Sequence, residues 1–380
     1  MIRLGIDNIQ DALPLLRDGR VALLTSVTGR SSENISTVDI LHACCRLTAL
    51  LAPEHGIRGD YHDGKDVANE TDEATGLPVY SLFSTADKHL SPELLEKFDI
   101  LVYDIQDVGL RFYTFISSLY NVMHDCAAAG KRVVVLDRPD PLGGEIVEGG
   151  LLQTKYRSFV GCCEIPTRYA LTAGEFARMV NEKEHIGCEL AVVPVTGWRR
   201  EQFPHWGRIW NMPSLALSTY EATVLYAGTC IFEGTALSEG RGTSAPMRII
   251  GAPGVDGEKM LREFRERRLP GVEATPVYFN PTASKHQGEV CGGLMLHVTD
   301  YEAIRPVTVG VELLDIFRRL YPEQAVFNPP FNPGGRQGIT LLTGRGDFVE
   351  DFDKDRILSA YAEESELFRR EKINYHLYGG

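Results

Sequence analysis

Polar side chains follow three apolar runs of the sequence, at the point where each run ends. The runs span residues 47–52, 100–105 and 133–136, and their length and β-branched content predict buried strands. Ligands of open α/β sheets bind beyond the carboxyl ends of the strands, so we expect these side chains to share one site. The side chains able to do chemistry after the three runs are Glu54, His55, Arg58, Gln106, Asp107, Arg111, Tyr113, Asp137, Arg138 and Asp140.

Glu54 is the first candidate for acid–base chemistry. It lies between a proline and a histidine in a glycine-bounded loop, where a carboxylate has no evident capping function. Glycoside hydrolysis typically uses two carboxyl groups, one donating a proton to the leaving oxygen and the other attacking or activating water. The candidates for the second group, which the sequence does not rank, are Asp104, Asp107, Glu233 and Glu239.

A second cluster of polar residues and glycines occupies residues 232–243. Three glycines, two carboxylates and one arginine within these twelve residues predict a tight loop that exposes its backbone. Arg241 is suited to binding a planar carboxylate, and Thr243 adds a hydroxyl to the same loop. We therefore expect a ligand clamp here, with a set of ordinary turns as the alternative.

Structural roles compete with functional ones at several of these positions. Asp104 lies within its strand and could form a structural ion pair with Arg138 or Arg111. The segment 137–139 could simply fix a turn, and Tyr113 could pack in a core. These alternatives remain open at the level of sequence.

The sequence predicts neither a metal nor a cofactor. Glu54, His55, Asp60, His62 and Asp63 are close together but match no standard set of metal ligands. No G-x-G-x-x-G follows a predicted strand, and a near-match to a phosphate-binding loop at 59–65 lacks the required serine or threonine at residue 66. The eight cysteines contain no C-x-x-C pair.

The elements that position these residues alternate between strand and helix. Further strands are predicted at 21–25 and 190–195, and helices at 39–45, 91–98, 112–129 and 172–184, the last beginning with a Thr172-x-x-Glu175 capping box. This alternation predicts an α/β fold, a Rossmann-like domain with a mostly parallel sheet.

The regular alternation of predicted strands and helices ends at about residue 245. Helices are predicted at 258–268, 307–321 and 356–370, a strand at 292–298, and a loop rich in proline, glycine and asparagine at 327–338. We expect a Rossmann-like catalytic domain at 1–245 and a smaller α+β domain at 246–380 that closes the active-site cleft.

Composition excludes several classes of protein. The 380 residues are 43% hydrophobic and carry a net charge of −13, which disfavours a nucleic-acid binder or a protein bound to an anionic membrane surface. No apolar stretch is long enough to span a bilayer. The N-terminal segment carries charges throughout and lacks a signal-like apolar core, so we expect a cytoplasmic protein unless a signal was removed.

Several long segments resemble one known family. They are, in order, APEHGIRG (52–59), LPVYSLF (77–83), DILVYDIQDVGLRFYTFI (99–116), VLDRPDPLGG (135–144) and EGTALSEGRGTSAP (233–246). With these segments the chain resembles the exo-β-N-acetylmuramidase (NamZ-like) family, formerly a family of unknown function. One segment departs from the family pattern, because NMPSLALS at 211–218 stands where a Ser-Pro-Asn-like run is expected near Pro213.

The resemblance implies an enzyme that releases N-acetylmuramic acid from the non-reducing ends of peptidoglycan fragments. Its substrate would be a disaccharide or muropeptide, with Glu54 as the principal acid/base. The lactyl carboxylate of this sugar requires a cation, for which Arg58, Arg111 and Arg241 are candidates, while His55, Gln106 and Tyr113 could bind sugar hydroxyls. The alternatives are a non-catalytic muropeptide-binding protein and a glycosidase for another amino sugar.

Overall fold

A computed structural model describes residues 2–54, 56–57, 70–82, 88–203, 209–330 and 332–379. Its first part is built on a sheet whose described strands follow the order β3-β4-β2-β1-β5-β6-β7. All neighbouring pairs are parallel except the edge pair β3–β4. The strands are β1 (Val21–Thr25), β2 (Leu47–Ala52), β3 (Glu70–Thr71), β4 (Pro78–Ser81), β5 (Ile100–Asp104), β6 (Arg132–Leu136) and β7 (Glu189–Val193).

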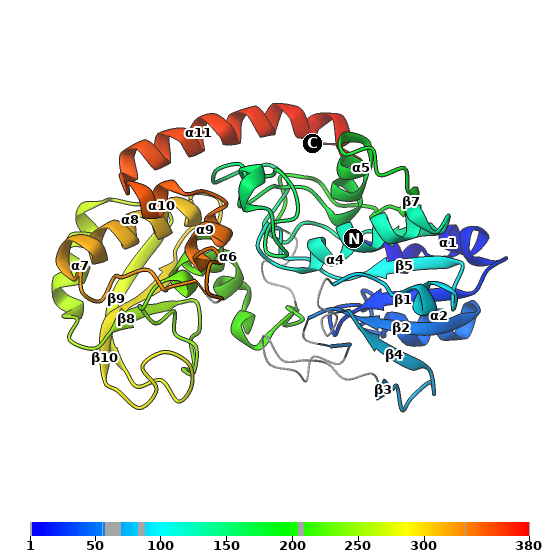
Figure 1. The fold of residues 1–380 in the computed structure, drawn as a ribbon, viewed down its shortest axis with the longest axis horizontal. Helices are drawn as coiled ribbons and strands as arrows, with labels where there is room; N and C mark the ends of the chain where they lie inside the picture. Colours follow the sequence, from blue (N-terminus) through cyan, green and yellow to red (C-terminus); the bar gives the residue numbers. More distant parts are fainter. Residues whose placement is uncertain are drawn as a thin grey trace.

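Helices cover both faces of this sheet, as the alternation of strands and helices predicts (Figure 1). Successive residues of a strand point to opposite faces, so Leu23 and Leu24 enter different cores. The first core lies under α1 (Ile9–Leu16) and α2 (Thr37–Cys44), and the second under α4 (Phe115–Ala128) and α5 (Ala173–Lys183). The short helices in this part are η1 (Gly5–Asn8), α3 (Pro92–Leu95) and η2 (Thr154–Tyr156).

The second part carries a smaller antiparallel sheet of described strands in the order β8-β10-β9. These strands are β8 (Ile249–Ala252), β9 (Val272–Phe279) and β10 (Cys291–Val298). The helices after β7 are η3 (Leu215–Leu217), α6 (Tyr220–Thr229), η4 (Cys230–Gly234), α7 (Gly257–Glu266), α8 (Pro306–Leu320), α9 (Gly338–Thr343), α10 (Asp347–Glu350), α11 (Lys354–Glu371) and η5 (Lys372–Tyr375).

Two glycines allow α6 and α8 to pack backbone against backbone. A β-carbon added at Gly228 would lie 1.7 Å from the carbonyl oxygen of Pro306, and one added at Gly310 would lie 2.1 Å from that of Gly228. Neither position accommodates a side chain without separating the helices. This contact ties α6, the helix that leads into the loop at 232–243, to the second part of the chain.

Helix α11 returns the chain from the second part to the first (Figure 1). It crosses above both parts and ends beside α5, where Lys372 Nζ donates hydrogen bonds to the carbonyl oxygens of Gly144 at 2.7 Å and Ala170 at 3.2 Å. The hydroxyl of Tyr378 then donates to Asp137 Oδ2 at 2.5 Å and accepts from the amide of Val195 at 3.1 Å. The end of the described chain is therefore anchored at the main sheet.

The predicted fold class is confirmed, and the element boundaries differ in places. All five predicted buried strands of the first part are present, as is the strand at 292–298. The helix predicted at 91–98 is confined to Pro92–Leu95, and the one predicted at 112–129 begins at Phe115. Elements that the sequence did not predict include β4, β8, β9 and α6. No helix among the described residues has the length and apolar character needed to cross a membrane. The division at residue 245 stays a prediction.

Candidate active site

A cavity of about 120 Å³ lies where the carboxyl end of the main sheet meets the loops around α6. Glu54 reaches it from the loop after β2, and Tyr113 and Thr114 reach it from the segment between β5 and α4. The opposite wall includes Glu233 in η4 and Arg241 in the glycine-rich loop. The other lining residues are Phe112, Val160, Ser214, Ala216, Leu217, Tyr226 and Leu342. Carboxyl groups from segments about 180 residues apart thus face one space.

Glu54 is half-buried at the edge of this cavity. The hydroxyl of Thr114 donates a hydrogen bond to Glu54 Oε2 at 2.8 Å. Thr114 is the N-cap residue of α4, so the first turn of a buried helix fixes the position of the donor. The carboxylate is therefore oriented by a partner whose own backbone is rigid.

Glu233 belongs to a network of two carboxylates and two cations. Arg241 Nη2 lies 3.1 Å from Glu233 Oε1, and its Nε lies 3.4 Å from Glu239 Oε1. Lys285 Nζ donates to Glu239 Oε2 at 2.7 Å and to the carbonyl oxygens of Phe232 and Leu237 at 2.7 and 2.9 Å. Lys285 thereby fixes both ends of the segment that carries Glu233.

The electrostatic surroundings of Glu233 favour its protonated form. Burial and the nearby carboxylate of Glu239 raise the pKa of Glu233 to about 8, against the opposing effect of the Lys285 ammonium. The carboxylate of Glu54 acts in the same direction as Glu239. At neutral pH this side chain can therefore donate a proton, which is the requirement for a general acid.

Aromatic rings form the apolar wall of the cavity. The ring of Tyr226 contacts Phe112 edge-on with centroids 5.1 Å apart, and Tyr113 at 6.3 Å. Tyr113 also packs edge-on against Phe115 at 4.8 Å. Burial raises the pKa of Tyr113 well above its ordinary value, so its phenol remains neutral. Tyr113 therefore packs against other rings and also lines the cavity, and its binding of a sugar hydroxyl stays a prediction.

The structure does not bring Asp104 to the cavity. This carboxylate is fully buried, and Arg138 binds it with Nε and Nη2 at 2.5 and 2.9 Å. Thr37 donates a further hydrogen bond to Asp104 Oδ2. Asp104 thus forms the structural ion pair that was one of the two alternatives.

Asp107 and Gln106 also lie outside the cavity, at a small hollow beside Asp140. Asp107 Oδ2 accepts hydrogen bonds from the amide of Gly109 at 2.8 Å and from the hydroxyl of Tyr169, and burial raises the pKa of Asp107 to about 6. Gln106 Nε2 donates to the carbonyl oxygens of Asp107 and Pro139 at 2.9 and 3.0 Å. These contacts shape the ends of β5 and β6 rather than the cavity.

Arg111 is directed away from the cavity. Its guanidinium is fully buried and donates to the carbonyl oxygens of Gly150 and Ile165, each within 2.8 Å, and to those of Leu342 and Thr343 at 3.1 and 2.8 Å. It links the two parts of the chain, so a lactyl carboxylate cannot reach it.

Thr243 has a role within its own loop. Its hydroxyl donates to the carbonyl oxygen of Gly240 at 2.6 Å and accepts from the amide of Ala245 at 3.1 Å. These bonds close the turn that follows Arg241, and Thr243 does not line the cavity.

Two of the expected site residues, His55 and Arg58, lie outside the described residues. The same holds for most of the side chains considered as metal ligands between 54 and 63. Within the described ranges, no group of three or more His, Cys, Asp or Glu side chains is arranged to hold a metal ion.

Sequence reasoning missed Thr114, Ser214, Tyr226 and Lys285 as contributors to this site. Thr114 lies inside a segment that carries the family resemblance, so a signal existed for it. Lys285 lies 46 residues after Glu239, and no local pattern connects the two. Ser214, with Ala216 and Leu217, places the divergent segment near Pro213 directly on the wall of the cavity.

Comparison with protein families decides the relationship suggested by the sequence. The N-terminal domain model of the exo-beta-N-acetylmuramidase NamZ matches residues 21–221, and the C-terminal domain model matches residues 224–378. The chain belongs to the NamZ exo-beta-N-acetylmuramidase family. The two NamZ models meet within α6, where the main sheet gives way to the second part of the chain.

Individual relatives agree with this assignment. The chain is 37% identical over 384 residues to the peptidoglycan beta-N-acetylmuramidase NamZ of Bacillus subtilis (strain 168), covering 99% of this chain and 91% of that protein. A crystal structure of a DUF1343 family protein from Bacteroides fragilis NCTC 9343 superposes with a TM-score of 0.91 at 33% identity, covering 99% of each chain. A second such protein from the same organism gives a TM-score of 0.79 at 30% identity, covering 100% of this chain and 99% of that one.

Proposed function

We propose that this protein is an exo-acting β-N-acetylmuramidase that removes N-acetylmuramic acid from the non-reducing ends of peptidoglycan fragments. The observation that carries the proposal is the placement of Glu54 and Glu233 on one cavity between the two parts of the chain. Two carboxyl groups facing a common space are the minimal machinery of glycoside hydrolysis. Membership of the NamZ family and the activity named for the Bacillus subtilis relative support the same substrate class.

Glu233 acts as the proton donor to the leaving oxygen in this proposal. Its raised pKa keeps it protonated at neutral pH, and Arg241 occupies one carboxyl oxygen so that the other can carry the proton. This assignment differs from the expectation that Glu54 is the principal acid/base. Glu54 instead supplies the second carboxylate, held in place by Thr114.

The action of Glu54 can follow one of three routes. It can attack the anomeric carbon, activate a water molecule, or orient the acetamido group of the sugar for internal attack. Direct or internal attack retains the anomeric configuration, and attack by an activated water inverts it. Proton NMR of the first-formed product therefore distinguishes the water route from the other two.

Arg241 is the proposed partner of the lactyl carboxylate. Of the three candidate arginines, Arg111 is held by backbone carbonyls and Arg58 lies outside the described residues, whereas Arg241 lines the cavity. A guanidinium binds a planar carboxylate through two parallel hydrogen bonds. Arg241→Gln is expected to raise KM for a muramide more than for the matching glucosaminide, which lacks the lactyl group.

The first experiment compares 4-nitrophenyl β-N-acetylmuramide with the matching glucosaminide, each with and without EDTA. Release from the muramide alone, unchanged by EDTA, supports the proposal. No release from either sugar together with tight muropeptide binding would instead establish a binding protein. Loss of turnover with EDTA would establish a metal-dependent hydrolase, and preference for the glucosaminide would establish another substrate.

Two variants then separate the roles of the carboxyl groups. Replacing a general acid costs about 10²- to 10⁴-fold when the leaving group is a sugar, and less when it is 4-nitrophenolate, which departs without full protonation. Glu233→Gln is therefore expected to lose more activity on a disaccharide than on the nitrophenyl muramide, while Glu54→Gln loses activity on both. Glu363→Gln, on an exposed face of α11, is the matched control and should behave as the wild type. If instead Glu54→Gln lost more activity on the disaccharide than on the nitrophenyl muramide, and Glu233→Gln lost activity on both, Glu54 would be the general acid.

A further inference from the structure

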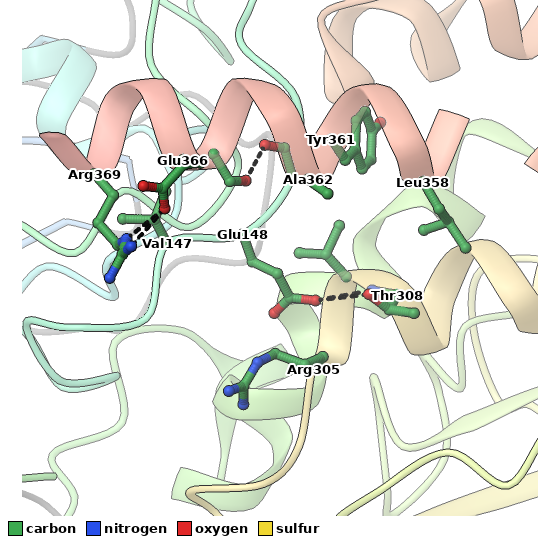
Figure 2. Close-up of a pocket in the computed structure, with 12 residues that line it drawn as sticks. Val147, Glu148, Arg305, Thr308, Leu358, Tyr361, Ala362, Glu366 and Arg369 are labelled. Carbon is green, nitrogen blue, oxygen red and sulfur yellow. Dashed lines mark hydrogen bonds and ion pairs between the residues drawn. The ribbon is translucent and has the colours of Figure 1, made fainter. Parts of the chain in front are cut away.

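A second cavity, of about 300 Å³, lies beneath α11 and shares no lining residue with the candidate active site (Figure 2). Three segments form it: residues 147–149 from the first part of the chain, residues 305–308 at the start of α8, and the side of α11 from Leu358 to Arg369. Neither the family relationship nor the proposed hydrolysis assigns a function to this cavity.

Glu148 places an unsatisfied carboxylate oxygen in this cavity. Only 7% of the residue is exposed, and its Oε1 accepts hydrogen bonds from the amide and hydroxyl of Thr308 at 2.9 and 3.3 Å. Its Oε2 has no hydrogen-bond partner among the described residues. Figure 2 shows the carboxylate between α11 and the start of α8. A buried carboxylate oxygen left without a donor is costly, which points to a donor supplied by a ligand.

Arg305 faces the same space without pairing with Glu148. Its Nη1 donates to the carbonyl oxygens of residues 302, 303 and 304 at 2.8, 3.1 and 2.9 Å. Its Nε and Nη2 form no hydrogen bond to the described part of the chain. Figure 2 shows the Glu148 carboxylate and the Arg305 guanidinium on the same side of α11, so a free acceptor and free donors line the cavity near each other.

The remaining wall combines apolar and polar side chains. Val147, Val307, Leu358 and Ala362 line the space between the charged groups. At the far edge, Arg369 is already paired with Glu366, with its Nε 2.8 Å from Glu366 Oε2. A ligand that fits this lining has a small apolar body with a donor at one end and an acceptor at the other.

We propose that this cavity binds an amino acid or short peptide with a free α-ammonium group. The ammonium donates to Glu148 Oε2, and the carboxylate or a peptide carbonyl accepts from Arg305. A simple anion does not fit, because it has no proton to donate and would leave Glu148 Oε2 unsatisfied. A metal ion does not fit either, because Glu148 offers one free oxygen and Arg305 adds a positive charge beside it. A bound peptide would contact the loop at 147–149, α8 and α11 together.

The test is calorimetric titration of the full chain with three probes: the dipeptide Ala-Ala, its N-acetyl derivative and its C-terminal amide. We expect Ala-Ala to bind, the N-acetyl derivative to bind at least about tenfold more weakly because it lacks the ammonium, and the amide to show an intermediate loss. No binding of Ala-Ala would overturn the proposal. Equal binding of the N-acetyl derivative would overturn the role given to Glu148.

Two variants locate the binding. Ala362→Trp fills the cavity from an exposed position of α11 without removing a hydrogen bond, and it is expected to abolish binding of Ala-Ala. Glu148→Gln keeps an acceptor for Thr308 but loses the charge, and it should weaken binding at least about tenfold. Glu363→Gln is the control and should bind as the wild type. Unchanged affinity in the Ala362→Trp variant would place binding elsewhere and overturn the proposal. Because the assay uses no sugar, its result is independent of the proposed hydrolysis.

Discussion

The charge network around Glu233 makes a specific prediction for the pH dependence of catalysis. A general acid is active only while protonated, so kcat/KM should fall at alkaline pH with a midpoint at the pKa of Glu233, about 8. At that pKa, roughly 90% of the molecules carry the proton at pH 7 and roughly 10% at pH 9. Neutralising a neighbouring carboxylate should move this alkaline limb downward, and removing a neighbouring cation should move it upward.

The size of the shift follows from the geometry of the network. One guanidinium contacts both carboxylates, at 3.1 Å from Glu233 and 3.4 Å from Glu239, and its two contacting nitrogens are roughly 2.3 Å apart, so the contacted oxygens are at most roughly 9 Å apart. At an effective dielectric constant of about 20, unit charges at that limit still interact by about 1.8 kcal/mol, or about 1.4 pKa units. Glu239→Gln should therefore lower the alkaline midpoint by about 1 to 2 pH units. Lys285→Met should raise it, because the ammonium opposes protonation of Glu233.

The assay is kcat/KM for a disaccharide substrate between about pH 5.5 and 10, because a poor leaving group makes proton donation limiting. Circular dichroism at each pH verifies that the variants are folded, and Glu363→Gln serves as the unshifted control. Opposite shifts in the two variants are expected. Identical midpoints in the wild type and both variants, or an alkaline limb that persists in Glu233→Gln, would refute the assignment of Glu233 as the acid.

Three further predictions concern stability, each measured by urea unfolding. Arg138→Met leaves the buried carboxylate of Asp104 without its cation and should lower the free energy of unfolding by about 3–5 kcal/mol; a loss below about 1 kcal/mol would contradict the structural role of this pair. Gly310→Ala forces a β-carbon against the backbone of Gly228 and should cost at least about 2 kcal/mol, so an unchanged midpoint would mean that the two helices separate freely. Thr172→Ala removes the capping box of α5 together with the hydrogen bond that the same hydroxyl donates to buried Asp137, and should cost about 1–3 kcal/mol; no measurable loss would show that neither contact contributes.

The main sheet could be predicted because its strands are buried on both faces. A parallel strand covered by helices on either side needs a continuous apolar run, and VVVL or ILVYDI is short enough to exclude a helix. The capping box at Thr172 marked the start of α5 within one residue. At these elements the local sequence favours the same secondary structure that burial in the folded protein requires.

The elements that escaped prediction lack such a local signal. Helix α6 is buried almost all round, so its apolar residues show no helical periodicity. Strand β9 contains Pro276, which argues against a strand unless it lies at the edge of a sheet, and β9 is indeed an edge strand. Both assignments depend on neighbours distant in sequence.

The candidate site also contains some features that the sequence predicts and others that it does not. The positions of Glu54 and Tyr113 follow from the rule that strand ends gather at one edge, and Glu233 and Arg241 follow from the composition of their loop. The direction of a side chain does not follow from these rules. Arg111 lies two residues before Tyr113 and yet enters a buried set of carbonyl groups, which became apparent only when segments from three regions of the chain were placed together.

The anchoring of Tyr378 on Asp137 and Val195 also bears on how the protein is synthesised. The main sheet is complete in sequence at β7, but the hydroxyl that meets Asp137 and the lysine that meets Gly144 belong to residues 378 and 372. During translation, the residues of the main sheet leave the ribosome well before residues 372 and 378 are synthesised. Asp137 already accepts hydrogen bonds from Thr172 and Gly174, and Gly144 accepts one from Arg200, so the donors on residues 378 and 372 are added to contacts that the first part makes by itself. The last hydrogen bonds to the edge of the main sheet therefore form only after the second part has been synthesised.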